Sequence, residues 1–265
     1  GKFKGALEGG RVGLKGFKKG ILEAGKSGQL FLNIGFKMID MTVQFALEQN
    51  KVTAEFRSNT GAGNEFNNVI RDTERAVFAT GITMGKVSEA VGVLKNEFTD
   101  YTYMSQEQQK ATAKTTVLLD QMGFSLSTQA SIMDTATQAM GMSAQEGEAL
   151  LIDLASTARS LGVDVNALGA AFEANKDFIV RFGEDGQEVF EELAVTAKAL
   201  GVDLGVLVKV TEGFETFDGA AKSVGRLNAI LGGPFLNSMD MLNASYEDPI
   251  EGIKMLREAF DQAGV

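Results

Sequence analysis

The chain has 265 residues, a hydrophobic content of 44% and a formal net charge of −10. It contains no His, no Cys and no Trp, which excludes a Cys/His zinc site, a Ser-His-Asp triad and a Cys-His dyad within it. Acid–base catalysis would depend on carboxylates, Lys or Tyr. We therefore expect a protein that is not an enzyme, with no catalytic, cofactor-binding or metal-binding residues and no cofactor.

The first predicted segment, residues 1–28, is basic and rich in glycine. Residues 1–27 carry a net charge of +5, which leaves −15 for the remainder. Glycine recurs every four residues at Gly5, Gly9 and Gly13. This spacing lets another backbone approach a helix closely, but glycine itself disfavours helix. Both a packed helix and a mobile tail stay open. The segment could contact phosphate or an anionic membrane surface, or be solvated, whereas the acidic remainder repels nucleic acid.

A nucleotide-binding pattern occurs within this head but lacks its structural context. Gly20–Ser27, "GILEAGKS", satisfies the bare GxxxxGK[ST] spacing. No strand precedes it, and the intervening residues Ile21–Ala24 are typical of helix. We therefore expect no nucleotide site there.

Residues 29–57 are predicted to form one long amphipathic helix. Lys37 and Asp40 argue against a simple transmembrane span. Met38 and Met41 fall on an apolar stripe and are interpreted as core residues, not as part of a cofactor site. Two adjacent apolar stripes are wider than a surface helix of a monomer needs, which indicates an oligomerisation helix. The stripes are Ile34, Met38, Met41, Phe45 and Leu32, Phe36, Ile39, Val43, Leu47.

Residues 58–231 are predicted to be an array of short antiparallel helices, arranged as helical hairpins. A repeated turn pattern carries this prediction: a glycine in the left-handed conformation that ends a helix, an apolar residue that packs back, and a Ser, Thr or Asp that caps the next helix. Ser105 with Gln108 fits a capping box. The pattern occurs in "GIT" at 81, "MGFS" at 122, "MGMS" at 140 and "LGVD" at 161 and 200.

The turns are regularly spaced, and part of the array repeats. The turn glycines Gly123, Gly141, Gly162, Gly183 and Gly201 stand 18 to 21 residues apart, which leaves room for helices of about 15 residues, roughly 22 Å long. An internal repeat at an offset of 39 residues aligns Leu154–Phe178 with Leu193–Phe217. A period of two helices is typical of stacked helical hairpins. No alternating strand pattern is present, so the predicted fold class is all-α.

The last predicted segment, residues 232–265, begins at Gly232-Gly233-Pro234. We expect Asp218 to cap a helix that ends at Leu231, followed by a hinge at residues 232–235 with no bound phosphate. Beyond it, Phe235, Leu236, Met239 and Leu242 are expected to pack on Leu227, Ile230 and Leu231.

Three further patterns remain, one at the start of the last helix and two among acidic residues. Asp248-Pro249 predicts the start of a final helix that runs to about Gln262. "EDGQE" at Glu184–Glu188 is too short for an EF-hand loop. Glu191 and Glu192 are interpreted as part of a solvated helix face.

Two runs of the sequence resemble segments of bacteriophage tail tape measure proteins. They are "SNTGAGNEFNNVIRDTERAVFATGITMGKVSEAVGVL", Ser58–Leu94, and "FETFDGAAKSVGRLNAILGGPFLNSMDMLNAS", Phe214–Ser245. The likeness covers about residues 58 to 245. Because tape measure proteins are usually much longer, it implies that the chain is the ordered part of a longer protein.

The resemblance implies a structural role in a virion. A tape measure protein occupies the tail tube lumen, sets tail length and assists DNA ejection across the host envelope. Expected partners are further copies of the chain, as a trimer or hexamer, tail tube proteins, tail tip or baseplate hub proteins, and the host inner membrane during ejection, without a specific nucleic-acid site. Two alternatives stay open: a helical-repeat scaffold or adaptor module, and a membrane-active pore-forming protein.

Overall fold

The computed structural model describes residues 47–264, and in it the chain divides into two compact units, Gly1–Asn59 and Thr60–Val265. Within the first unit, the described residues are helical, and that helix continues to residue 60. The predicted helix over 29–57 is therefore helical where it is described, but it ends three residues later. Its two apolar stripes, apart from Leu47, lie outside the described residues.

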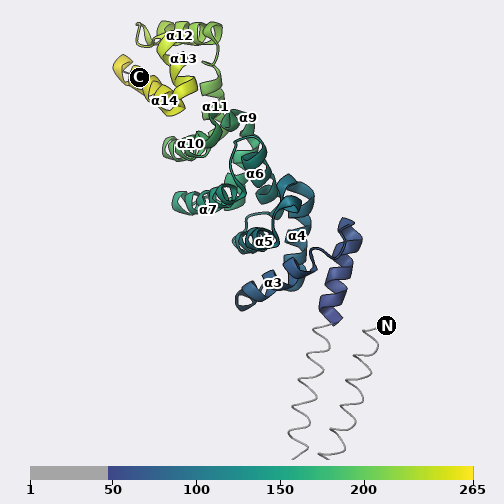
Figure 1. Cartoon of the computed structure of the whole chain (residues 1–265). Helices are drawn as coiled ribbons and strands as arrows, with labels where there is room; N and C mark the ends of the chain where they lie inside the picture. The colour runs from purple at the N-terminus through teal and green to yellow at the C-terminus, as the bar shows by residue number, and fades with distance from the viewer. Residues whose placement is uncertain (1–46, 265) are drawn as a thin grey trace, which may run out of the picture. The chain divides into compact units, whose positions relative to one another are not determined.

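The second unit is built of α-helices and short 3-10 helices, and no strand occurs between residues 47 and 264, as the all-α prediction requires (Figure 1). The α-helices are α3 (Asn67–Val77), α4 (Met84–Glu97), α5 (Gln106–Gln121), α6 (Leu126–Gln138), α7 (Ala144–Leu161), α8 (Val165–Ala174), α9 (Lys176–Ile179), α10 (Gly186–Leu200), α11 (Leu204–Glu212), α12 (Phe217–Leu231), α13 (Ser238–Glu247) and α14 (Pro249–Ala263). The 3-10 helices are η1 (Phe78–Thr80), η2 (Thr99–Tyr103) and η3 (Val180–Asp185).

Left-handed glycines end the helices where the turn pattern predicts them. Gly162 closes α7 with φ 63°, and Gly201 closes α10 with φ 68°. The N–H groups of Gly162 and Val163 donate to the carbonyls of Arg159 and Ala158, the two bonds of a Schellman motif. The predictions for both glycines are confirmed. The apolar residue after the glycine packs less uniformly than expected, since Phe124 is buried but Val202 is 41% exposed.

Side-chain caps start several helices, although two predicted caps are wrong. Ser105 and Ser143 each form a complete capping box, and Asp164 and Asp203 cap α8 and α11. Ser125 makes no side-chain cap bond at the start of α6. The other wrong cap lies at the start of α12.

Thr216, not Asp218, caps α12. Thr216 has an extended backbone, and its hydroxyl accepts from the Gly219 N–H at 3.0 Å. The helix therefore begins two residues earlier than predicted. Asp218 lies in its first turn, where it pairs with Lys222.

The 39-residue repeat corresponds to two pairs of helices, α7–α8 and α10–α11. Helices α7 and α8 pack on each other, as do α10 and α11, and α7 also packs on α10. Equivalent apolar positions are buried in both copies: Leu154, Ala155, Ala158 and Leu168 in the first, and Leu193, Ala194, Ala197 and Leu207 in the second. The copies differ at the end, because Phe178 is buried whereas Phe217 is 66% exposed.

Helix α8 approaches α6 closely at a glycine. A Cβ atom added to Gly169 would lie 2.5 Å from Cε2 of the Phe124 ring, which is itself fully buried. The glycine is therefore required by packing and not by its backbone conformation. Gly225 in α12 is the opposite case, since a Cβ there would meet nothing within 4 Å.

The last three helices share one apolar core. Its buried members come from the loop before α12, from α12, from the connection to α13, and from α13 and α14: Phe214, Ala220, Val224, Leu231, Leu236, Met241 and Ala259. Leu227, Phe235 and Leu242 pack against it, as expected for residues on either side of the Gly-Gly-Pro segment. Ile230 and Met239, which were expected to join them, are instead 77% and 46% exposed.

Candidate functional site

The Gly-Gly-Pro segment interrupts the chain between α12 and α13, as predicted. Gly232 has φ 78°, and the next helix starts at Ser238 with Asn237 as its cap. Pro234 lacks an N–H and cannot continue the helix. Asp248 also caps α14 with Pro249 at its first turn, and that helix ends at Ala263, one residue beyond the predicted end.

Asn228 holds this connection together with both its backbone and its side chain. Its carbonyl accepts from the N–H groups of Gly232 and Gly233. Its side-chain amide donates to the Leu236 carbonyl at 2.8 Å and accepts from the Leu236 N–H at 2.9 Å. The amide thus satisfies both the N–H and the carbonyl group of Leu236, as the backbone of a paired β-strand would.

These bonds bear on the choice between a hinge and an anion site. A phosphate loop needs several free N–H groups that face the ligand. In this segment the N–H groups of Gly232, Gly233 and Leu236 donate to Asn228, and Pro234 has none to offer. The local bonding therefore favours a structural connection over a phosphate site.

An open apolar groove of about 520 Å³ lies among α11, α12 and α14. Helix α14 packs on both α11 and α12, and the groove lies where the three helices meet. The lining residues are Lys209 and Val210 from α11, Gly213 and Phe214 from the loop after it, Ser223, Arg226 and Leu227 from α12, and Leu256 and Phe260 from α14. Leu227, Leu256 and Phe260 are only half-buried, so they present apolar surface to the groove.

The charged side chains that line this groove are both basic. None of its nine lining residues is acidic, whereas Lys209 and Arg226 are basic and exposed. Within residues 47–264, neither makes an ion pair, although Lys222 in the same helix as Arg226 pairs with Asp218 at 2.7 Å. The lining therefore contributes two positive charges without a carboxylate partner, on a chain of net charge −10.

The close approach of α12 to the preceding loop fixes one end of the groove. The Ser223 hydroxyl donates to the Gly213 carbonyl at 3.2 Å. A Cβ on Gly219 would lie 3.1 Å from that carbonyl oxygen, so a glycine in α12 allows the loop to pass this closely. Gly213 and Ser223, which both line the groove, are thereby held against each other.

A second depression, of about 410 Å³, has a different character. It is lined by Pro234, Phe235 and Leu236 of the connection and by residues of α13 and α14. Asp240 and Glu258 contribute carboxylates to it. The same three-helix core thus carries a basic apolar groove and a depression with acidic residues.

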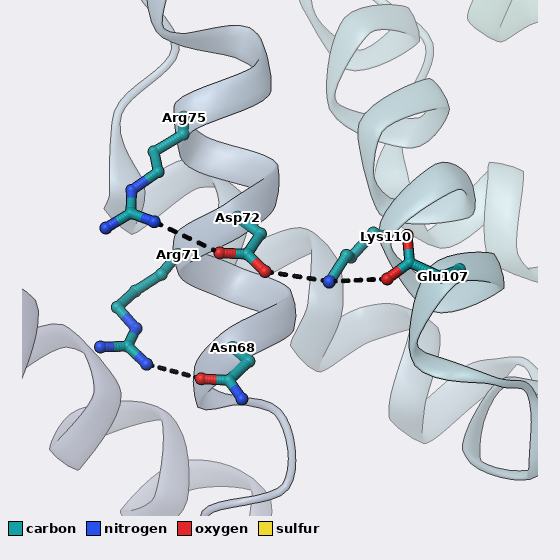
Figure 2. Close-up of polar contacts among 6 residues, drawn as sticks. All are labelled: Asn68, Arg71, Asp72, Arg75, Glu107 and Lys110. Atoms are coloured by element: carbon teal, nitrogen blue, oxygen red, sulfur yellow. Dashed lines mark hydrogen bonds and ion pairs between the residues drawn. The ribbon is translucent and has the colours of Figure 1, made fainter.

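A polar network joins α3 to α5 at the surface of the second unit. Figure 2 shows Lys110 between two carboxylates, with Nζ 2.9 Å from Asp72 and 3.0 Å from Glu107. The hydrogen bond from Lys110 lowers the pKa of the Asp72 carboxyl, and the Asp72 bond raises the pKa of Lys110. Arg75 pairs with Asp72 as well. Every charge in this network therefore has a partner of opposite sign or, in the case of Arg71, a hydrogen bond to the Asn68 amide.

Glu191 differs from the solvated carboxylate that the sequence predicted, whereas Glu192 is exposed. One side-chain N–H₂ group of Gln187 donates to Glu191 at 3.1 Å and to Asp153 of α7 at 2.9 Å. Burial disfavours the charged form and raises the pKa of Glu191, and the nearby Asp153 charge acts in the same direction. Ionisation of Glu191 thus opposes folding.

The remaining candidate residues are distributed as follows. Gly20–Ser27, Met38 and Met41 lie outside the described residues. Glu184–Glu188 spans the end of η3 and the start of α10, so it forms no separate loop. No group of three or more acidic side chains between residues 47 and 264 is arranged to hold a metal ion, and no helix there is long and apolar enough to cross a membrane.

Sequence reasoning missed the groove and the role of Asn228. Asn228 lies within the apolar run of α12, and no sequence motif around it indicates its hydrogen bonds to Leu236. A signal for the groove was present in the two unpaired basic residues of α11 and α12, but their proximity depends on how α14 packs. Comparison of the chain with protein-family models, with curated proteins and with solved structures found no match.

Proposed function

We propose that the chain is the ordered part of a bacteriophage tail tape measure protein, which sets tail length, occupies the tail tube lumen and assists DNA ejection across the host envelope. The observation that carries this proposal is the likeness of Phe214–Ser245 to that family. In the structure, this run spans α12, the Asn228-bonded connection and most of α13, so the resemblance covers a coherent structural element. The role is assembly, without catalysis.

The helical arrangement supports the same proposal. We take α7–α8 and α10–α11 as copies of one hairpin unit, because equivalent apolar residues are buried in both and the two pairs pack on each other. Such an array offers long helical surfaces to neighbouring chains in a filament. We place its location in the virion, inside the tail tube or at the tail tip.

Association between copies is assigned to residues 29–57. The sequence gives that segment two adjacent apolar stripes, more than one neighbouring helix can cover. A trimer or hexamer around an axis would bury both stripes. Its further partners are tail tube proteins, the tail tip or baseplate hub, and the host inner membrane during ejection.

Two measurements test these assignments separately. Mass spectrometry of tails purified from the virus or prophage that encodes the chain should recover peptides from residues 60–264. Their absence from intact tails would contradict the proposal. Sedimentation of the chain should show a trimer or hexamer, and substitution of Met38 and Met41 by Glu should convert it to a monomer. A monomeric wild-type chain at high concentration would remove the oligomerisation assignment alone.

A second candidate function is a helical-repeat scaffold or adaptor module. The 39-residue repeat favours it, since stacked helix pairs form extended binding surfaces in such proteins. The tail measurement separates the two, because a cellular adaptor would not be a stoichiometric component of purified tails. The pore-forming alternative draws on residues 1–50, and liposome leakage by the isolated chain would support it.

A further inference from the structure

We propose that the groove between α11, α12 and α14 binds an acidic amphipathic helix of a partner protein. The inference does not depend on the proposed function, because it follows from the groove itself. Two features determine the occupant. They are the apolar floor, formed by Val210, Leu227, Leu256 and Phe260, and the basic sides, formed by Lys209 and Arg226.

The floor matches the apolar face of a helix. Leu227, Leu256 and Phe260 are half-buried, and Val210 is 37% exposed, so the groove leaves four large apolar side chains partly in water. Covering them removes apolar area from water, which stabilises a complex in proportion to that area. Val206, one helical turn before Val210, is 50% exposed and extends this apolar surface along α11.

The length of the surface fits two turns of a partner helix. Residues 206 to 213 span about 10 Å along the chain at 1.5 Å per residue. Helices that dock in grooves insert side chains spaced at i, i+3 or i+4, and i+7. Anchors at i and i+7 of a partner are separated by the same distance of about 10 Å.

The charges specify an acidic occupant. Lys209 belongs to α11 and Arg226 to α12, so one cation comes from each of two sides of the groove. Within the described residues, neither has a carboxylate partner. A helix with Glu or Asp on both flanks of its apolar stripe would supply one carboxylate to each cation. A basic helix would meet uncompensated repulsion at both.

A single-chain amphiphile, such as a fatty acid, fits these features less well. Pockets for small ligands enclose 70–90% of the ligand surface, whereas this groove is wide open to solvent. A fatty acid also carries one carboxylate at one end, and the two cations stand on different helices. The geometry therefore favours a helix.

The experiment uses the full chain and two synthetic helical peptides of 18 residues. Both carry Leu at i, i+3/i+4 and i+7 positions. One has Glu on the flanks of the Leu stripe and the other has Lys there. Binding is measured by fluorescence anisotropy, and the site is located from NMR shifts of the Val210 methyl groups. The expected result is binding of the Glu peptide at least tenfold tighter than the Lys peptide, with an affinity that falls as salt is raised and the charges are screened.

Charge-reversal variants locate the interaction without disturbing the core. The Lys209→Glu/Arg226→Glu variant changes two exposed side chains and should weaken binding of the Glu peptide at least tenfold. Lys222→Glu is the matched control, because it is a cation of α12 that does not line the groove; it should leave binding within twofold. Circular dichroism confirms that each variant is folded.

Several outcomes would overturn the proposal. One is that the Glu peptide does not bind at 1 mM, or that the two peptides bind equally. Another is that Lys222→Glu weakens binding of the Glu peptide as much as the double variant does. A third is that the peptide changes the NMR shifts of other residues but not those of the Val210 methyl groups. Laurate that displaces the Glu peptide at lower concentration than the peptide itself would instead identify a small-amphiphile site. None of these results would bear on whether the chain is present in phage tails.

Discussion

Replacing Asn228 by Ala should destabilise the last three helices, because its amide makes two hydrogen bonds to the backbone of Leu236. Each such bond contributes about 1 kcal/mol net, and a buried backbone group left without a partner costs about 1–3 kcal/mol. Leu236 is only 7% exposed, so water cannot readily replace both bonds. The expected loss in the free energy of unfolding is therefore about 2–4 kcal/mol.

Hydrogen exchange at the Leu236 amide is the most direct assay of this loss. Because 1.4 kcal/mol corresponds to a factor of ten, a loss of 2 kcal/mol raises the opening equilibrium about 30-fold, and exchange at Leu236 should accelerate accordingly. Asn228→Asp keeps the acceptor for the Leu236 N–H but loses the donor to its carbonyl, so this variant should also be destabilised at neutral pH. Lys222→Ala, an exposed change in the same helix, is the control. Unchanged exchange at Leu236 in Asn228→Ala would refute the role given to this side chain.

Three further predictions concern single residues. Gly169→Ala should destabilise the fold by about 1–3 kcal/mol, because its new Cβ overlaps a buried aromatic ring. Gly225→Ala should instead stabilise the fold by about 0.5–1 kcal/mol. Urea unfolding measures both changes in stability, and changes of the same sign would contradict the packing argument. Gly162→Val should cost about 1 kcal/mol or more, since valine must adopt φ 63°, and an unchanged melting temperature would count against this. Glu191→Gln should be more stable than the wild type at neutral pH, because the raised pKa of Glu191 means that its ionisation opposes folding. That advantage should shrink as the pH falls through the raised pKa toward 4.5 and be absent below it.

Local rules were sufficient for the helix ends. Gly162 and Gly201 could be predicted because a left-handed residue after a helix is almost always glycine, whatever surrounds it. The capping boxes at Ser105 and Ser143 are likewise contained within four residues of sequence. Such features need no knowledge of tertiary packing.

The errors arose where another residue, near or distant in sequence, replaced the expected partner of a local motif. The Ser125 N–H donates to Asn166 of α8, at 3.1 Å, and the Ser125 side chain makes no cap bond. Phe217 repeats Phe178 in sequence, but it starts a new helix and is exposed. The first outcome depends on a contact between helices, and the second on the Thr216 cap, which starts α12 at Phe217.

The candidate groove lay beyond sequence reasoning for the same reason. Its lining residues come from three helices that lie apart in the sequence, and only the packing of α14 on α11 and α12 brings Lys209, Arg226 and Phe260 to one place. The absence of His and Cys from the chain limits the chemistry to be considered. It gave no indication of where a binding surface would form.

The proposal that the chain builds phage tails is tested most directly by tail length in a deletion strain. The coding region for residues 60–264 is removed in frame from the virus or prophage that encodes it, and a strain with the same region recoded silently is the control. Electron micrographs of purified particles then give the number and the length distribution of tails. The account predicts that the recoded control assembles tails of uniform length and that the deletion yields particles without tails or with tails of altered length. Tails of normal number and length in the deletion strain would contradict it.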